Sequence, residues 1–281
     1  MSTALHWLAL AFYLGATVVY LAFVISQRRG FFRMGRLILW IGWVLHTAAI
    51  AVAWVELGAL PAASLRQSLD LFSWAIVGSA LLLNLRLAIM VLGALAAPLG
   101  VVAMLAASVL PPAVQAPTPV FKSLWLTLHV ATVMGAYGLL AVTCLGALLY
   151  LLLDWRIRAK KLGPLFKRLP SLSLVDALNH RALLAGFTLM TVGMITGAVY
   201  AQLVLGSYWR WDPKEVWSLI TWLLYAALLH TRLVSGWRGR RGAWLAIAAF
   251  GVLLFTFIGV GLLMPGYHSF DAFTTVGGGQ P

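Results

Sequence analysis

Long apolar runs separated by short charged clusters dominate the chain. Stretches free of Asp, Glu, Lys and Arg cover residues 1–27, 37–55, 71–85, 87–121, 123–153, 182–209, 216–231 and 242–270. A membrane-spanning helix needs about 20 mostly apolar residues, so this pattern predicts eight transmembrane helices. The two shortest stretches reach that length if the flanking charged side chains, such as Asp70 and Arg232, lie at the headgroups. Prolines between residues 111 and 119 end the fourth helix and predict an exposed connection.

The composition agrees with a membrane protein and excludes several other classes. Of 281 residues, 62% are hydrophobic and 10% are charged, whereas soluble domains keep about a quarter of their residues charged. The net charge of +13 comes from Lys and Arg clusters between apolar runs, which is typical of membrane topology and does not indicate nucleic-acid binding. The single cysteine, Cys144, allows no disulfide framework. Any dithiol chemistry must therefore come from a partner.

The distribution of basic residues predicts the orientation. In an eight-helix arrangement, all but four of the 20 Lys and Arg residues fall on one side, the exceptions being Arg66, Lys122, Arg210 and Lys214. By the positive-inside rule the richer side is cytoplasmic, and both termini are extracytoplasmic. We therefore expect an all-α, polytopic integral membrane helical bundle in the plasma membrane. It forms a single membrane domain over 1–281, with four helices in 1–121, four in 122–270, and a flexible tail, 271–281.

Four histidines fall at two depths of the expected bundle. His129 lies about 10 Å below the outer end of the fifth span, and His268 follows the last span on the same side. His46 lies roughly 13 Å above the cytoplasmic end of the second span, and His230 lies near the cytoplasmic end of the seventh. The depths therefore group these histidines into an outer pair and an inner pair.

Each pair could hold a haem iron, because neutral imidazole is a preferred axial ligand and a helical bundle can enclose a porphyrin. This interpretation predicts two haem sites, one on each side of the membrane. The alternative is that a histidine merely forms a hydrogen bond across a helix interface. We favour that interpretation for His6 and His180, which lie near the ends of their helices.

The outward loop 206–217 reads GSYWRWDPKEVW and contains the start signals of a helix. Asp212 fits the N-cap, Pro213 the first helical position and Glu215 the third, which together predict the start of the seventh helix. An aromatic belt at the headgroups is the ordinary explanation for the tryptophans. Flat indole rings also stack on flat aromatic ligands, and Arg or Lys pairs with carboxylates such as haem propionates. The predicted haem platform comprises Tyr208, Trp209, Trp211, Asp212 and Trp217, with Arg210 and Lys214 as propionate contacts.

These residues resemble a known family. The run 208–222 resembles the WWD signature of the haem-handling membrane proteins of cytochrome c maturation, and its Asp-Pro-Lys-Glu portion resembles the CcsA (ResC) branch. The resemblance extends to the segments around His129, His180, His230 and His268, and more weakly to that around His46. It covers residues 122–270 clearly, which makes that half the expected haem-handling core.

The resemblance implies the haem-binding half of a System II cytochrome c synthase. Haem b would cross the membrane and be presented at the loop, where its vinyl groups react with the two thiols of an apocytochrome c CxxCH motif. The implied partners are a CcsB (ResB)-like membrane subunit, with which the chain would form a holocytochrome c synthase, and a thioredoxin-like thiol reductant. In fused synthases the partner of the inner histidine comes from the CcsB portion, so His46 as an inner ligand rests on depth alone.

Two other functions stay open at this point. HemX-like relatives share the WWD run and are associated with the control of haem biosynthesis. A membrane b-type electron carrier would also hold two stacked haems, but it has no need of an open tryptophan-lined platform.

Overall fold

The computed structural model describes residues 1–87, 89–111, 122–160 and 170–266, and within these ranges all regular structure is helical. The helices are α1 (Ser2–Ser26), α2 (Arg29–Leu57), α3 (Leu65–Leu87), α4 (Met90–Val109), α5 (Leu124–Arg158), α6 (Leu172–Leu205), α7 (Pro213–Leu233), α8 (Arg240–Leu254) and α9 (Val260–Leu263). The π-helical turn η3 (Phe255–Gly259) joins α8 to α9.

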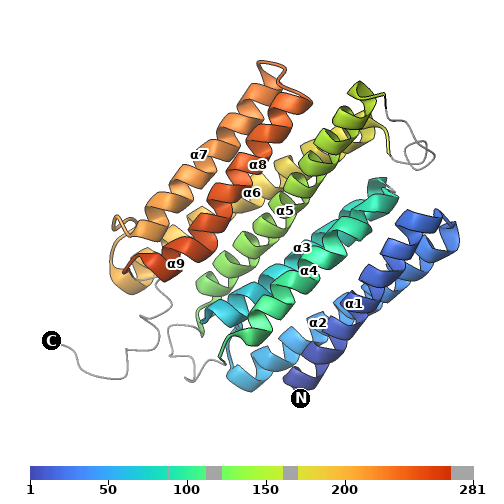
Figure 1. Cartoon of the computed structure of the whole chain (residues 1–281). Helices are drawn as coiled ribbons and strands as arrows, with labels where there is room; N and C mark the ends of the chain where they lie inside the picture. Colours follow the sequence, from blue (N-terminus) through green and yellow to red (C-terminus); the bar gives the residue numbers. More distant parts are fainter. Residues whose placement is uncertain (88, 112–121, 161–169, 267–281) are drawn as a thin grey trace.

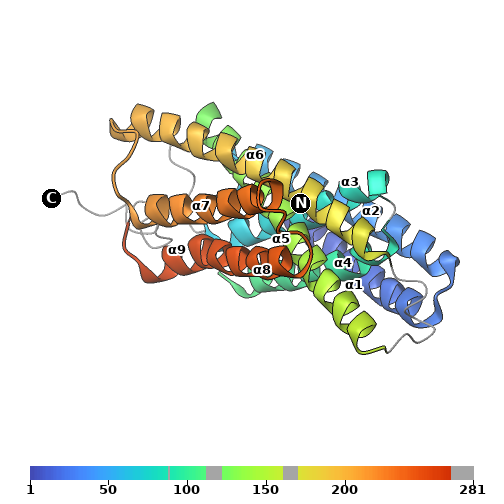
Figure 2. The same cartoon turned by 90° about the horizontal axis from the view of Figure 1, so that it is seen from above.

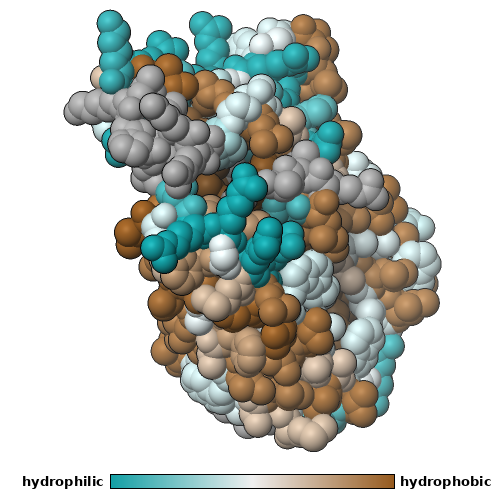
Figure 3. Space-filling model, turned by 90° about the vertical axis from the view of Figure 1, so that its right-hand side faces the viewer, coloured by the Kyte–Doolittle hydropathy of each residue, from teal (hydrophilic) through white to brown (hydrophobic). Residues whose placement is uncertain are grey.

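These helices confirm the prediction of a multi-pass membrane protein. Eight are long and apolar enough to cross a membrane, with α8, η3 and α9 forming the last span, Arg240–Leu263. On the face seen in Figure 3, hydrophilic side chains gather mostly in the upper part, and hydrophobic residues cover most of the remainder. Such an apolar exterior is expected where lipid replaces water as the solvent.

The helices pack as a row of antiparallel hairpins. Figure 1 shows α1 and α2 at one side, α3 and α4 in the middle, and α7 with α8 at the other side. Extensive contacts join α1 to α2, α3 to α4 and α5 to α6, and α3 also packs on α5. Figure 2 shows α6, α7 and α8 running alongside one another.

Among the described residues, two large hydrophobic cores and one small cluster of Leu149, Leu153 and Val175 follow from this order. The larger core draws on α3 to α8, and the smaller one joins α1 and α2 to α3 and α4. Small residues let the helices approach closely, as at Gly138, where a Cβ atom would overlap the carbonyl of Ala75 on α3. Close contact between small residues is the usual basis of helix packing in membranes.

The bundle has two ends, which we name by residues that lie there. The Trp209 end contains the start of α1, the α6–α7 connection and the end of α9; the Arg28 end contains the α1–α2 and α7–α8 connections (Figure 1). The start of α1 and the end of α9 thus lie on the same side. This agrees with an even number of spans, and the assignment of the Trp209 end to the extracytoplasmic side remains a prediction.

Candidate functional site

The connection between α6 and α7 is a short turn with defined geometry. Gly206 ends α6 with a left-handed conformation, φ 73°, which glycine adopts without strain. The Ser207 hydroxyl donates to the Trp209 carbonyl oxygen at 2.8 Å and accepts from the Trp209 amide at 3.4 Å. Trp211 also has a positive φ, 60°, which is uncommon for a bulky residue and often marks a functional turn.

The aromatic side chains of this turn face outward. Trp211 is 76% exposed and Tyr208 62% exposed. The rings of Trp209 and Trp211 lie perpendicular, with centroids 5.7 Å apart. The turn therefore presents flat apolar surface at the Trp209 end.

The N-terminus of α7 is a capping box, which confirms the predicted helix start. The Asp212 Oδ1 atom accepts from the Lys214 amide at 2.9 Å, and Glu215 Oε2 accepts from the amides of Arg210, at 2.8 Å, and Asp212, at 3.3 Å. Asp212 is buried. Two carboxylates thus satisfy amides at the positive end of the helix and hold the preceding aromatic turn in place.

The segment after α9 packs against this cap. At Gly266 a Cβ atom would overlap Oδ2 of Asp212 and lie 3.3 Å from Cδ of Pro213. His268 follows two residues later and lies outside the described residues. The chain therefore reaches the α7 cap just before His268, the predicted outer ligand.

His129 lies half-buried on α5, near the same end. Its Nδ1 atom lies 2.7 Å from the carbonyl oxygen of Gly193 on α6. A carbonyl only accepts, so Nδ1 carries the proton, and in the neutral ring Nε2 carries the lone pair. At Gly197, one turn along α6, a Cβ atom would lie 2.6 Å from Nδ1. The missing side chain at Gly197 forms the notch that admits the imidazole, and the carbonyl of Gly193 fixes its tautomer.

Trp217 and Trp222 are anchored between helices. Trp217 packs edge-on against Phe255 of η3, with ring centroids 4.6 Å apart. Trp222 donates through Nε1 to the Thr191 hydroxyl at 2.9 Å and stacks on Phe187 of α6. Trp217 therefore supports the start of α7 from within, in contrast to the exposed Trp211. The sequence alone did not separate these two roles.

A π-helical turn stands where the last span meets α7. The Thr256 hydroxyl lies 2.8 Å from that of Thr221 and donates to the Trp217 carbonyl at 3.3 Å. Both threonines are fully buried. Single π-turns within α-helices are frequent at functional sites, and this one fixes Phe255 against Trp217.

The expectation that His46 and His230 lie at one depth is wrong. Because α2 begins at Arg29, well before the apolar stretch from residue 37, His46 lies roughly 25 Å from the Arg28 end. His230 lies in the last turn of α7, close to that end. Moreover, α2 packs on α1, α3 and α4, whereas α7 packs on α6, α8, η3 and α9. The structure does not bring these two histidines together.

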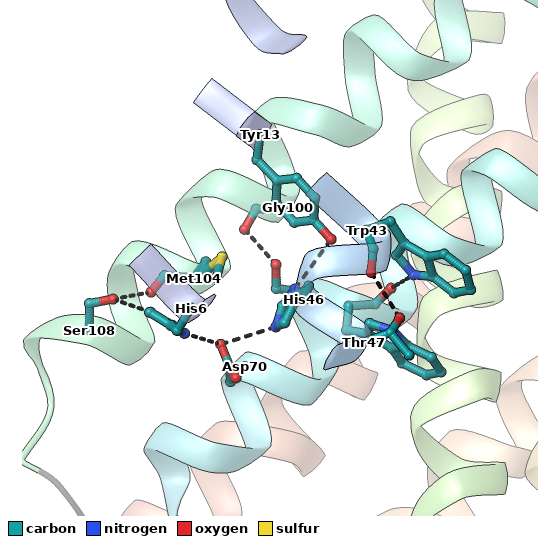
Figure 4. Close-up of polar contacts among 11 residues, drawn as sticks. His6, Tyr13, Trp43, His46, Thr47, Asp70, Gly100, Met104 and Ser108 are labelled. Atoms are coloured by element: carbon teal, nitrogen blue, oxygen red, sulfur yellow. Dashed lines mark hydrogen bonds and ion pairs between the residues drawn. The ribbon is translucent and has the colours of Figure 1, made fainter. Parts of the chain in front are cut away.

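His46 instead belongs to a buried polar cluster with His6 (Figure 4). Oδ1 of Asp70, on α3, lies 3.0 Å from His6 Nδ1 and 3.3 Å from His46 Nε2. The other nitrogens face hydroxyls, His6 Nε2 at 3.0 Å from Ser108 and His46 Nδ1 at 3.2 Å from Tyr13. Sequence reasoning placed Asp70 at the headgroups and missed this cluster. The sequence feature that could have indicated the cluster is an acidic residue directly beside an apolar stretch.

A buried ion pair lies near the remaining histidines at the Arg28 end. Arg232 Nη2 donates to Asp176 Oδ2 at 2.5 Å and to the Asp176 carbonyl at 3.0 Å, linking α7 to α6. His180 is half-buried one turn along α6, and His230 is exposed. His230 therefore faces away from the described helices.

Comparison with known proteins identifies the family. Residues 62–268 match the cytochrome C assembly protein family. The chain belongs to this family. Its relatives include proteins named cytochrome c biogenesis protein CcsA from Synechococcus sp. (strain CC9902), 36% identical over 85% of this chain and 86% of the relative, and from Guillardia theta, 35% identical over 80% and 81%. The matched region contains His129, the tryptophan loop, His230 and His268, but not α1 or α2.

The fold also occurs in a larger protein of known structure. The cytochrome c haem lyase CcmF superposes with a TM-score of 0.67 at 20% identity, covering 98% of this chain and 48% of CcmF. The chain thus spans about half the length of that protein. At this identity the likeness establishes a shared helical arrangement only.

Proposed function

We propose that this cytochrome c biogenesis protein binds haem and presents it at the Trp209 end for attachment to the CxxCH motif of an apocytochrome c. The geometry of His129 carries the proposal. Ligating histidines characteristically donate their second N–H to a carbonyl or carboxylate, which orients the ring and raises the basicity of the ligating nitrogen. The contact between His129 and Gly193 is of this kind.

The outer site follows from the residues near His129. His268 is the proposed second axial ligand, and the contact of Gly266 with Asp212 supports its place beside the loop. Tyr208, Trp209 and Trp211 form the platform, and Arg210 and Lys214 are the proposed propionate contacts. Asp212 and Trp217 act by holding the loop and the start of α7.

The inner site rests on one histidine of this chain. His230 is the proposed ligand, and its exposed position favours a second ligand from a CcsB-like membrane subunit. His46 is not part of this proposal, because both its nitrogens face groups within the α1–α4 half. A complete inner site therefore requires the partner.

The chemistry assigned to this chain is positioning. Haem, when bound, supplies the vinyl groups to which the cysteine thiols add, without a leaving group. The histidines orient the porphyrin, the tryptophan platform leaves one edge accessible, and the capping box keeps the platform rigid. Holding reactants in a productive geometry is itself a large catalytic contribution. A thioredoxin-like reductant would keep the apocytochrome thiols reduced, since the chain has only Cys144.

Gene deletion and complementation test this function. Loss of the gene is expected to abolish covalent haem staining of c-type cytochromes, and the parent gene to restore it. The His129→Ala variant is expected to fail and to recover partly with added imidazole. His180→Ala provides a matched control, because His180 lies at the opposite end. Normal c-type cytochromes in the deletion strain would contradict the proposal and favour a HemX-like role.

A further inference from the structure

A cavity of about 460 Å³ opens at the Arg28 end, between the end of α5 and the α7–α8 connection. Its lining includes four arginines from three elements: Arg158 of α5, Arg238 of the connection, and Arg240 and Arg241 of α8. Asp154 is the only acid among the lining residues described, and its Oδ2 accepts from Arg158 Nε at 2.9 Å. The cavity therefore carries a surplus of positive charge.

Two of these arginines lie where positive charge is unfavourable. Arg240 and Arg241 occupy the first turn of α8, where the helix dipole is positive and acidic side chains are normally found. No side chain caps this helix at Gly239. An anion held by these arginines would offset both their mutual repulsion and their unfavourable position on the dipole. The cavity thus favours a negatively charged ligand.

Tryptophans place the cavity at headgroup level. Trp155 of α5, Trp237 of the connection and Trp244 of α8 are 53%, 40% and 57% exposed. Exposed tryptophan on several elements at one end of a membrane bundle marks the interface between headgroups and acyl chains. The Arg241 guanidinium also lies 5.7 Å from the Trp237 ring centroid, which holds this cation beside the cavity.

An apolar stripe continues from the arginines along α8. Trp244, Ala248 and Gly251 are exposed and follow Arg240 and Arg241 on one face of the helix. Nothing lies within 4 Å of a Cβ atom built at Gly251. Beyond Trp244, the small residues Ala248 and Gly251 leave this face of α8 uncovered, which suits an acyl chain. This continuity favours a lipid over a free phosphate.

We propose that the cavity binds the phosphodiester headgroup of an anionic membrane lipid, with one acyl chain along the exposed face of α8. Guanidinium groups match phosphate oxygens through paired, charge-assisted hydrogen bonds. The proposal concerns the end opposite the tryptophan loop and is independent of the haem function. It predicts a local site, in contrast to general attraction between basic loops and an anionic membrane.

Titration of the purified, delipidated full chain in detergent tests the site. Phosphatidylglycerol is expected to bind with higher affinity than phosphatidylcholine, as measured by native mass spectrometry. The double variant Arg240→Gln and Arg241→Gln is expected to weaken phosphatidylglycerol binding by roughly tenfold or more. The matched control, Arg29→Gln with Arg33→Gln, removes two exposed charges at the same end and is expected to stay within about twofold of the parent.

Further measurements distinguish a lipid site from general surface charge and from a site for free phosphate. If the two double variants weaken binding equally, general surface charge explains the attraction and the site is refuted. If millimolar inorganic phosphate displaces the lipid completely, the cavity is a free-phosphate site and the lipid assignment is wrong. Should the double variant not fold, Arg238→Gln lies in the exposed connection and is expected to weaken binding in the same direction. An unchanged affinity in that variant would also contradict the proposal.

Discussion

The notch around His129 allows a sharp prediction for Gly197→Ala. The new Cβ atom would lie 2.6 Å from Nδ1 and 2.7 Å from Cε1 of the ring. Both distances are far below van der Waals contact, so the imidazole must move and its 2.7 Å hydrogen bond to Gly193 must lengthen or break. The change leaves every proposed ligand in the sequence and alters only the position of one.

Three free-energy terms bear on the magnitude. Losing the hydrogen bond costs about 1 kcal/mol, and overpacking at such a contact costs about 1–3 kcal/mol. Alanine recovers up to about 1 kcal/mol of helix propensity over glycine. The helix-propensity gain is the same with and without haem, so it cancels from the affinity. Returning the displaced ring to its ligating position costs the overpacking energy, about 1–3 kcal/mol, which lowers haem affinity roughly five- to 150-fold.

The assay is a haem titration of purified protein followed by absorbance. Gly15→Ala is the matched control, because its Cβ atom would lie in ordinary contact, 3.8 Å from Cγ2 of Ile38 on α2. We expect weaker haem binding by Gly197→Ala and parental binding by Gly15→Ala. Equal affinities for both variants and the parent would refute the claim that the notch positions an axial ligand.

Three further substitutions test interactions that stabilise the fold. The measurement for each is thermal unfolding in detergent. Asp212→Ala removes the α7 cap and should lower stability by about 1 kcal/mol, whereas Asp212→Asn should retain most of it; equal losses would contradict the capping role. Arg232→Met leaves the Asp176 carboxylate unpaired and should cost about 3 kcal/mol, with partial recovery when Asp176→Asn is added. Asp70→Ala removes the shared acceptor of His6 and His46 and should cost about 1–3 kcal/mol; an unchanged midpoint would show that the cluster does not stabilise the α1–α4 half.

Much of the architecture was predictable because membrane solvation constrains the chain strongly. Apolar stretches of sufficient length must become helices whose backbone groups are paired internally, and the described residues contain eight helices long and apolar enough to span a membrane. The start of α7 was predictable for a local reason. Asp212, Pro213 and Glu215 act within one turn of helix, so their roles depend little on the rest of the fold.

Depth along a helix was harder to predict, because the ends of membrane helices extend past the apolar stretch. α2 starts at Arg29, among charged residues that precede the apolar stretch 37–55. His46 therefore lies about two turns farther from the start of its helix than the apolar stretch predicts. Asp70 was missed for a related reason. A charged residue usually marks the border of a span. Pairing with two histidines, however, lets the Asp70 carboxylate lie inside the bundle.

The pattern of apolar and polar residues could not predict the contacts between helices. The glycine notch on α6 and the anchoring of Trp217 by Phe255 depend on which helices become neighbours and on their rotation. Periodicity sets neither quantity. The sequence therefore indicated which residue types gather at the Trp209 end, and the structure separated the exposed aromatics from those that support them.

The absorption spectrum of the purified protein, oxidised and reduced, tests the central claim most directly. The parent, co-expressed with a CcsB-like partner, is expected to show a bis-histidine haem signal that His129→Ala and His268→Ala both weaken. His230→Ala is expected to weaken a separate component, and His46→Ala to weaken neither. A parent that carries no haem even with the partner present would contradict the account.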